Sequence, residues 1–189
     1  MQRVHREGII EVVLDSITLV RQLRLPHMVV GALAVAIWGK PRATTDVDLM
    51  IQVPPGAWER VKRRAGQAGF EFDAVWDFHN PMLRDQHARF FKNKLAVDFM
   101  GVRDAQDQQA VQRRRFKMFV PGRRISVIAP DDLVLHKIKA GRPRDFDDAV
   151  GVLRRSGALM DYDYLWNWAT RFRMDDELAY LLRHISENP

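Results

Sequence analysis

The sequence predicts an α/β protein, in which a small mixed, mainly antiparallel sheet with flanking helices is followed by a helical C-terminal half. Of its 189 residues, 47% are apolar, which is enough to build a sizeable buried core. Up to residue 128, short apolar or alternating runs typical of strands are interspersed with helical runs. After Pro130 the pattern changes to helix. We therefore expect a core over residues 1–128 and a helical region over residues 129–189.

The elements of the first region follow from the spacing of its apolar residues and from its turn residues. Helices are predicted over residues 9–21, 32–38, 56–68 and 103–115. Strands are predicted over residues 28–30, 46–52, 70–75, 89–92, 95–100 and 125–128. Asn93 and Lys94 form the turn between two of these strands, and residues 76–87, which contain Asn80-Pro81, are predicted to be a loop.

The second region is predicted to contain four helices. Pro130, followed by two aspartates, starts the first, because acidic side chains are stabilising at the positive end of a helix dipole. Pro143 starts the second, and a glycine ends each of these two helices. Two further helices are predicted over residues 162–172 and 175–186.

The composition excludes several kinds of site and structure. The chain has no cysteine, which rules out disulfides, thiolate zinc sites and a cysteine nucleophile. Its longest apolar run, residues 28–38, is shorter than the roughly 20 residues that a membrane helix needs. The first residues carry no secretory apolar segment. We therefore expect a soluble, cytoplasmic protein with no membrane partner.

The charge is strongly basic. Thirty Lys and Arg residues against 24 Asp and Glu give a formal net charge of +6. Part of the excess gathers in four clusters: residues 62–64, 113–115, 123–124 and 154–155. Such clusters attract nucleotides or RNA, although each of them is also what a solvated helix face looks like.

The strongest local signal is the pair of carboxylates in the strand over residues 46–52. Side chains two apart on a strand share one face, so Asp46 and Asp48 lie together. Two neighbouring carboxylates repel each other, and a divalent cation such as Mg²⁺ relieves the repulsion while leaving ligand positions for water and phosphate. The alternative is an exposed acidic edge strand without a ligand.

A third carboxylate strengthens the interpretation of this pair. Asp98 interrupts an otherwise apolar strand over residues 95–100, where an unpaired charge is costly. If this strand neighbours the strand of Asp46 and Asp48, three carboxylates converge, which is the ligand set of a two-metal phosphoryl-transfer site. The alternative is an Asp98 that bonds to a turn or to an arginine.

A glycine lies where the strand over residues 28–30 runs into the next helix. Backbone N–H groups at a helix N-terminus attract anions, and Gly31 places no side chain in their way. Gly31 could equally serve only to let the helix pack closely.

The arrangement of these motifs resembles the nucleotidyltransferases of the DNA-polymerase-beta-like superfamily, and most of all the AbiEii-like family, which includes toxins of abortive-infection and toxin–antitoxin systems. The motifs that carry the resemblance span residues 28–155. They are the Gly31 turn, the spaced residues Arg42, Thr44, Asp46 and Asp48, the later Asp98, and the helical motif over residues 130–148 with Lys137, Arg142, Asp145 and Asp148. Ala32 departs from the family, which usually has Gly or Ser after its first glycine.

The resemblance implies a reaction in which a nucleoside monophosphate passes from a nucleoside triphosphate to an acceptor hydroxyl. Asp46 and Asp48 would bind the Mg²⁺ (or Mn²⁺) that carries the triphosphate, and Asp98, with a second ion, would act as the general base. The turn at Gly31 and Ala32 would contact the β- and γ-phosphates. The remaining residues expected to form the nucleotide site are Arg42, Thr44, Lys137, Arg142, Asp145 and Asp148.

The downstream helical motif also has a physical interpretation. Lys137 lies in a helix that otherwise buries apolar residues, so its ammonium must reach a polar site or extend to solvent. Asp145 and Asp148 are three apart and share one helix face. These residues either bind the triphosphate or form ion pairs that join two helices.

The acceptor stays open at this stage. The resemblance and the basic clusters favour RNA, with a tRNA 3′ end as one candidate, and a toxin role would add a cognate antitoxin as partner. A small molecule of the antibiotic type is an alternative acceptor. A different class of function is a non-catalytic module that uses the same fold to bind a nucleotide or a protein.

Overall fold

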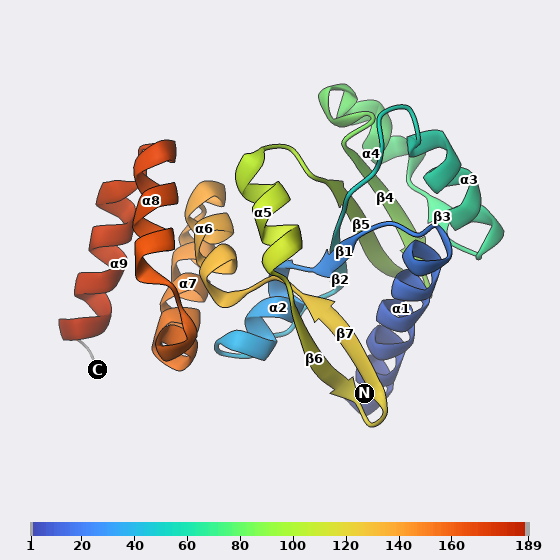
Figure 1. Ribbon diagram of the computed structural model, residues 1–189. Helices are drawn as coiled ribbons and strands as arrows, with labels where there is room; N and C mark the ends of the chain where they lie inside the picture. The colour runs from blue at the N-terminus through green and yellow to red at the C-terminus, as the bar shows by residue number, and fades with distance from the viewer. Residues whose placement is uncertain (1, 188–189) are drawn as a thin grey trace.

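The computed structural model describes residues 2–187 and contains one seven-stranded sheet. Its strands are β1 His27–Val29, β2 Asp46–Ile51, β3 Glu71–Phe72, β4 His87–Lys92, β5 Leu95–Gly101, β6 Arg115–Val120 and β7 Arg123–Val127. They lie in the order β3-β4-β5-β2-β1-β7-β6 (Figure 1). β2 pairs with β5 and β1 with β7 in parallel, and the other neighbours pair in antiparallel fashion. The predicted mixed, mainly antiparallel sheet is confirmed.

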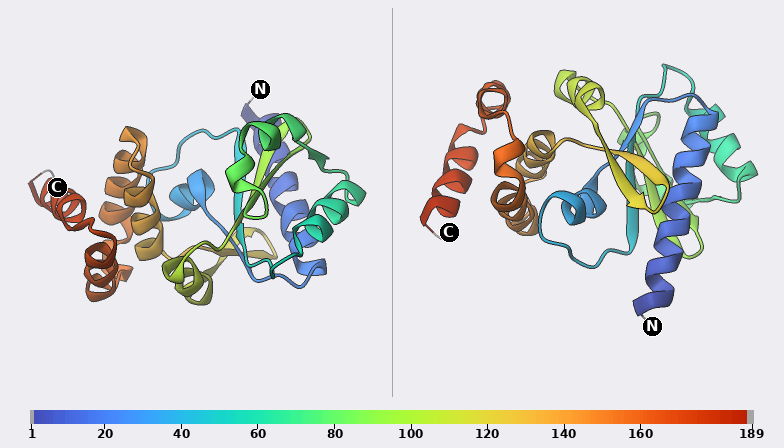
Figure 2. Two further views of the ribbon diagram at one scale, coloured as in Figure 1. Left: turned by 90° about the horizontal axis from the view of Figure 1, so that it is seen from above. Right: turned by 60° about the horizontal axis from the view of Figure 1, so that its bottom comes forward.

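Helices cover both faces of this sheet. Those preceding Pro130 are α1 Gln2–Gln22, α2 Gly31–Trp38, α3 Trp58–Gln67, α4 Ala74–His79 and α5 Ala105–Arg113. Those that follow are α6 Pro130–Ala140, α7 Pro143–Ser156, α8 Tyr162–Phe172 and α9 Asp175–Glu187. α1 and α3 lie on one face, whereas α2 lies on the other, with α6 to α9 beyond it (Figures 1 and 2). Within residues 2–187, no helix has the length and apolar character needed to cross a bilayer.

The central strand β2 divides its side chains between the two faces. Val47 and Leu49 are fully buried on the face that α1 covers, where they join the core formed with apolar residues of α1 such as Val13 and Ile17. Asp46 and Asp48, which alternate with them along the strand, point to the opposite face. The alternation expected of a strand therefore fixes which side of the sheet carries charge.

A two-residue turn joins β4 to β5. Asn93 and Lys94 both have positive φ angles, of 51° and 65°, as a type I′ hairpin turn requires. The turn sets the register of the hairpin, in which Lys92 pairs with Leu95. Continuing the ladder places Arg89 directly opposite Asp98.

The helices after Pro130 are tied to α2. The Trp38 indole N–H donates to the Ile128 carbonyl at 2.8 Å, and the Ser156 hydroxyl donates to the Trp38 carbonyl at 2.6 Å. Arg155 donates to the Gly39 carbonyl at 2.9 Å. The end of α2 is thus held against α7, which keeps the loop that follows it next to the helical region.

Two stretches differ from the sequence prediction. Residues 76–87, predicted to be a loop, contain most of α4 and a 3₁₀ turn over Pro81–Leu83. The Asp73 carboxylate caps α4 by accepting from the Trp76 N–H at 2.8 Å, which ends the predicted strand over residues 70–75 after Phe72. Residues 115–120 form an edge strand, β6. The sequence analysis ended a helix at residue 115 and assigned no element to residues 116–120.

Candidate active site

Three charged side chains form a row across neighbouring strands. β2 and β5 run parallel in a register that pairs Asp48 with Asp98, and β5 and β4 pair Asp98 with Arg89. Asp46 lies two residues before Asp48 and therefore shares its face of the sheet. The predicted convergence of Asp46, Asp48 and Asp98 is present, because the two strands that carry them are neighbours.

The turn at Gly31 makes room for this row. Gly31 has a φ of +59°, and a Cβ atom added to it would lie 1.9 Å from the Asp48 Oδ2. The Val30 N–H also donates to the Asp48 carbonyl at 3.0 Å. Glycine is required here both by the left-handed backbone and by the carboxylate beside it. This second reason was not visible in the sequence.

The carboxylates differ in their electrostatic state. Burial, followed by the charges of Asp46 and Asp98, raises the pKa of Asp48 to about 7. Burial would also raise the pKa of Asp98, but hydrogen bonds from His87 and Arg89 outweigh it and lower that pKa below its usual value. Asp98 is therefore ionised at neutral pH. The ionised form of Asp48, by contrast, would be stabilised by a neighbouring cation.

Two residues of β4 that the sequence analysis did not name hold Asp98, and one of them provides the bond to an arginine that it gave as an alternative. His87 Nε2 lies 2.7 Å from the Asp98 Oδ1, and Arg89 donates to the same carboxylate at 2.9 and 2.8 Å. Trp76 of α4 packs against both, with 4.4 Å between its ring and that of His87 and 5.3 Å from its ring to the Arg89 guanidinium. Asp98 is only 3% exposed as a result.

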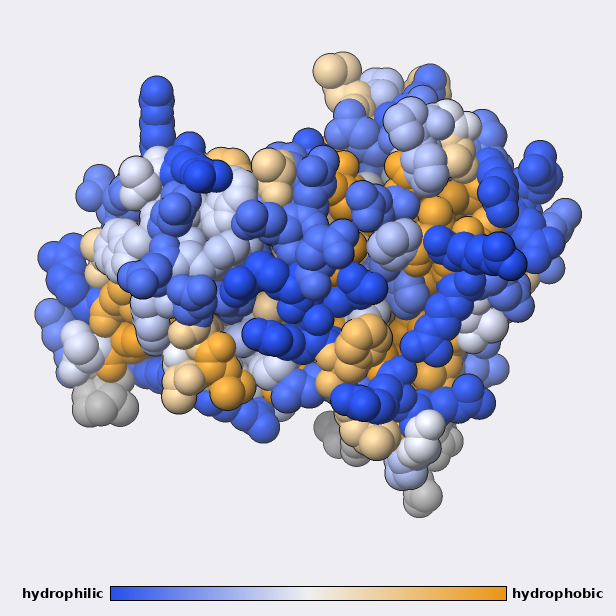
Figure 3. Space-filling view, viewed as in Figure 1, coloured by the Kyte–Doolittle hydropathy of each residue, from blue (hydrophilic) through white to orange (hydrophobic). Residues whose placement is uncertain are grey.

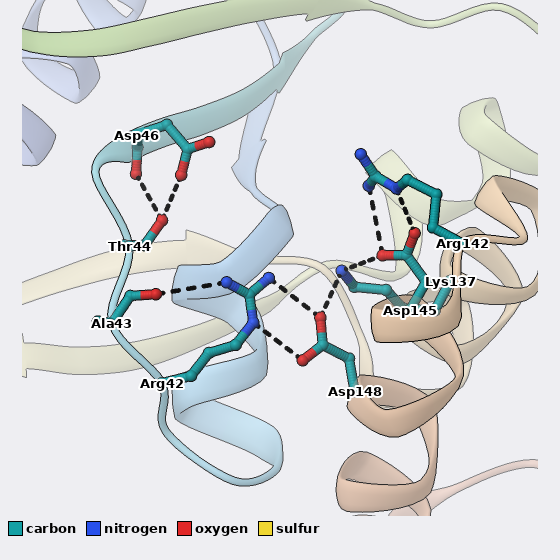
Figure 4. A network of polar contacts seen from close by, with 8 residues as sticks. All are labelled: Arg42, Ala43, Thr44, Asp46, Lys137, Arg142, Asp145 and Asp148. Carbon is teal, nitrogen blue, oxygen red and sulfur yellow. Dashed lines mark hydrogen bonds and ion pairs between the residues drawn. The ribbon is translucent and has the colours of Figure 1, made fainter.

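Lys137 lies at the centre of an ion-pair network between α6 and α7 (Figure 4). Its ammonium is 2.8 Å from a carboxylate oxygen of Asp145 and 2.8 Å from one of Asp148. Arg142 pairs with Asp145, and Arg42 pairs with Asp148 through two hydrogen bonds of 3.0 and 3.1 Å. Of the two alternatives for Lys137, a polar site or extension to solvent, the structure has the polar site, because the side chain is 6% exposed and its ammonium is shared by two carboxylates.

The same network reaches the strand of the paired aspartates. Arg42 belongs to the loop between α2 and β2, and Thr44 in this loop donates its hydroxyl to the Asp46 carboxylate (Figure 4). The Arg42–Asp148 pair therefore anchors to α7 a loop that contacts Asp46. The predicted ion pairing between two helices is present, and it extends to this loop.

These residues surround one cavity of about 1140 Å³. Its lining includes the predicted residues Gly31, Ala32, Arg42, Thr44, Asp46, Asp48, Asp98, Lys137, Arg142 and Asp145. It also includes residues that the sequence analysis did not single out: His87, Arg89, Arg103, Lys139 and Arg144. Residues from both predicted regions of the chain, 1–128 and 129–189, form the wall of this cavity.

The four basic clusters do not line this cavity. α3 carries residues 62–64 and α7 carries residues 154–155, and these two helices lie on opposite sides of the molecule (Figures 1 and 2). Arg113 is used internally, since it pairs with Asp131 and Asp132 and lies 3.7 Å from the centre of the Tyr164 ring. Figure 3 shows hydrophilic residues spread over most of the face seen in Figure 1, with smaller apolar patches between them.

The carboxylates at the cavity could hold at most a small metal site. In the part of the chain that the structure describes, no group of three or more His, Asp or Glu side chains is placed to hold a metal ion. Both Asp98 oxygens accept hydrogen bonds, whereas Asp46 and Asp48 face the cavity as a repelling pair. The pair fits one divalent cation, because the charge of such an ion would offset the burial and the repulsion that raise the pKa of Asp48.

Three solved structures have a similar fold. The antibiotic-resistance factor ANT(2'')-Ia matches with a TM-score of 0.59 at 12% identity, over 94% of this chain and 97% of that one. The lincosamide antibiotic adenylyltransferase LnuA, solved with lincomycin, matches with a TM-score of 0.52 at 10% identity, over 77% of this chain and 94% of that one. TM1012 of Thermotoga maritima, assigned as a nucleotidyltransferase, matches with a TM-score of 0.51 at 17% identity, over 75% and 90%.

These similarities establish the class of fold. The chain shares the fold of these three proteins. No model of a known protein family matches the sequence, and no curated protein matches it by sequence. The narrower resemblance to the AbiEii-like family stays a prediction.

Proposed function

We propose that the protein is a nucleotidyltransferase, which transfers a nucleoside monophosphate from a nucleoside triphosphate to an acceptor hydroxyl and releases pyrophosphate. The observation that carries the proposal is the pairing of Asp48 with Asp98 on adjacent parallel strands, with Asp46 on the same face and the cavity in front of them. The shared fold with other nucleotidyltransferases supports the same reaction class.

In this proposal Asp46 and Asp48 bind the Mg²⁺ or Mn²⁺ ion that accompanies the triphosphate. Such an ion supplies positive charge for the phosphate oxygens as the α-phosphorus is attacked. Thr44 orients Asp46 by donating its hydroxyl to the carboxylate. Gly31 leaves the space that Asp48 needs, and the N–H groups at the start of α2, from Ala32 onward, add a field that favours phosphate.

Asp98 is the proposed general base. Its Oδ1 accepts from both His87 and Arg89, whereas Oδ2 accepts one hydrogen bond and keeps a lone pair for the acceptor hydroxyl. The acceptor proton passes to Oδ2 as the acceptor oxygen bonds to the α-phosphorus. The bond from phosphorus to the leaving pyrophosphate oxygen then breaks.

The triphosphate would lie toward the ion-pair network. Arg142 of this network is exposed at the cavity, so it can contact a terminal phosphate while Asp145 orients it. Lys137, Arg42 and Asp148 hold this wall in place through their shared ion pairs. The function proposed for Lys137 is thus to support the nucleotide site from within the wall.

The test is transfer of label from each α-³²P nucleoside triphosphate, with Mg²⁺, to the components of a cell extract. Asp48→Asn should abolish the transfer because it removes an ion ligand, whereas Asp147→Asn, an exposed position of α7, should leave it intact. Nucleotide binding without transfer to any component would favour the non-catalytic binding module instead.

We propose a small hydroxylated acceptor in preference to RNA. The cavity of about 1140 Å³ is slightly larger than the range of about 300–1,000 Å³ typical of small-ligand clefts, and the basic clusters expected to bind RNA lie outside it. LnuA, whose fold is similar, is a lincosamide antibiotic adenylyltransferase. Purified protein should therefore label a hydroxylated antibiotic of the lincosamide or aminoglycoside type. Labelling of tRNA alone would instead support the RNA acceptor, and with it the toxin role and an antitoxin partner.

A further inference from the structure

Asp98 occupies an unusual position for a third carboxylate beside a metal site. It is 3% exposed, and three hydrogen bonds from His87 and Arg89 engage both of its oxygens. A cation bound at this carboxylate would share it with a guanidinium that already forms two parallel hydrogen bonds. Arg89 thus supplies beside Asp98 the positive charge that a second ion would bring.

The fold holds Arg89 in this place. The β4–β5 register sets Arg89 directly opposite Asp98, so their Cβ atoms lie at the short spacing of a cross-strand pair. The Trp76 ring lies 5.3 Å from the guanidinium, a cation–π distance that restricts its movement. The hydrogen bonds from Arg89 to Asp98 raise the pKa of Arg89 further, so it stays charged at every relevant pH.

Charge balance points in the same direction. Asp46, Asp48 and Asp98 carry three negative charges, which one divalent ion and one guanidinium neutralise. A second divalent ion would add two positive charges next to Arg89, and like charges at this range repel each other. Asp98 already has a cationic partner in Arg89. The carboxylates that still need a cation are Asp46 and Asp48, which repel each other.

We propose that this centre binds a single divalent ion, on Asp46 and Asp48, and that the Arg89 guanidinium takes the place of the second ion beside Asp98. The inference rests on the proposed nucleotidyltransferase function, since it concerns the metal of that site. It replaces the two-ion set expected from the sequence with one ion and one arginine. Arg89 is then a positioning residue, which fixes and neutralises Asp98.

The experiment counts the ions and asks whether they lie together. Full-length protein is titrated with Mn²⁺ in the presence of each α,β-methylene ribonucleoside triphosphate in turn, and electron paramagnetic resonance records the bound ions. Two Mn²⁺ ions about 3.5–4 Å apart are spin-coupled, whereas a single ion gives an uncoupled six-line spectrum. Wild type should bind one equivalent with an uncoupled spectrum.

Arg89→Gln removes the charge but keeps a hydrogen-bond donor, so it should gain a second equivalent of Mn²⁺ and a coupled spectrum. Arg103→Gln removes another cavity guanidinium, one that does not contact Asp98, and should stay at one equivalent. Arg89→Lys keeps the charge and should also stay at one.

The wild-type spectrum decides the proposal even if a variant fails to fold. A coupled pair of ions in wild type would overturn it while leaving the nucleotidyltransferase function intact. Failure of a well-folded Arg89→Gln to gain a second ion would also overturn it, because Arg89 would then not be what excludes that ion. Absence of any Mn²⁺–nucleotide binding by wild type would refute the proposed function, and with it this inference.

Discussion

Gly31→Ala tests how closely the turn before α2 and the Asp48 carboxylate fit together. The backbone at Gly31 has a φ of +59°, which costs an L-residue about 1–2 kcal/mol. The smaller conformational freedom of unfolded alanine offsets about 0.4–1 kcal/mol of that cost. The new Cβ would lie 1.9 Å from the Asp48 Oδ2, so the carboxylate must move, at a further cost of about 1–3 kcal/mol.

Gly122→Ala is the matched control. Gly122 has a φ of +74°, and nothing lies within 4 Å of a Cβ added there, so this variant carries the backbone cost without the collision. In chemical denaturation, the free energy of unfolding of Gly31→Ala should be lower than that of Gly122→Ala by about 1–3 kcal/mol, the cost of displacing Asp48. Mn²⁺–nucleotide affinity should fall in Gly31→Ala alone. Equal stability of the two variants, with metal affinity unchanged, would refute the proposed contact.

Two further predictions concern the buried charges. Lys137→Met should lower the free energy of unfolding by about 3 kcal/mol, because it leaves Asp145 and Asp148 buried without their shared ammonium. Arg144→Met, at an exposed position of the same cavity, should change it by less than about 0.5 kcal/mol, and equal effects would contradict the burial argument. In metal-free protein the pKa of Asp48 is raised to about 7, above its unfolded value of about 4, so its contribution to stability is present at low pH and is lost as pH rises from about 4 to 7. At about pH 8, Asp48→Asn should therefore be more stable than wild type, by up to about 4 kcal/mol, and Mg²⁺ should narrow this difference. Denaturation curves with a wild type as stable as the variant would contradict the raised pKa.

Local chemistry predicted most of the elements, because each is signalled within its own residues. The strand of Asp46 and Asp48 and the helices that begin at Pro130 and Pro143 lie where the sequence places them. The helix α4 was missed because its N-cap, Asp73, lies inside the apolar stretch that resembled a longer strand. Residues 116–120 of β6 received no assignment from the sequence, and only Arg115 fell within the preceding predicted helix.

The candidate site depends on both local and distant pairing. Arg89 was predictable in principle: a two-residue turn at Asn93 and Lys94 fixes the hairpin register, and counting back from the turn sets Arg89 opposite Asp98. The pairing of Asp48 with Asp98 was not, since parallel strands joined by a long connection carry no local register signal. The ion pairs of Lys137 depend on how α7 packs against α6, which helical spacing alone does not specify.

The turn between β4 and β5 limits the changes in length that this part of the chain can accept. Surface hairpin loops ordinarily tolerate insertions and deletions, because nothing downstream depends on their length. Here a residue added at Asn93 that shifted β4 by one position would send the Arg89 and His87 side chains to the other face of the sheet, whereas one taken up in a longer loop or a bulge would keep the register. Length variation should therefore be selected against at this turn, whereas the turn at Gly122, between β6 and β7, has no such constraint from Asp98. The length of an exposed loop outside the cavity lining is thus constrained by the pairing of Arg89 with Asp98.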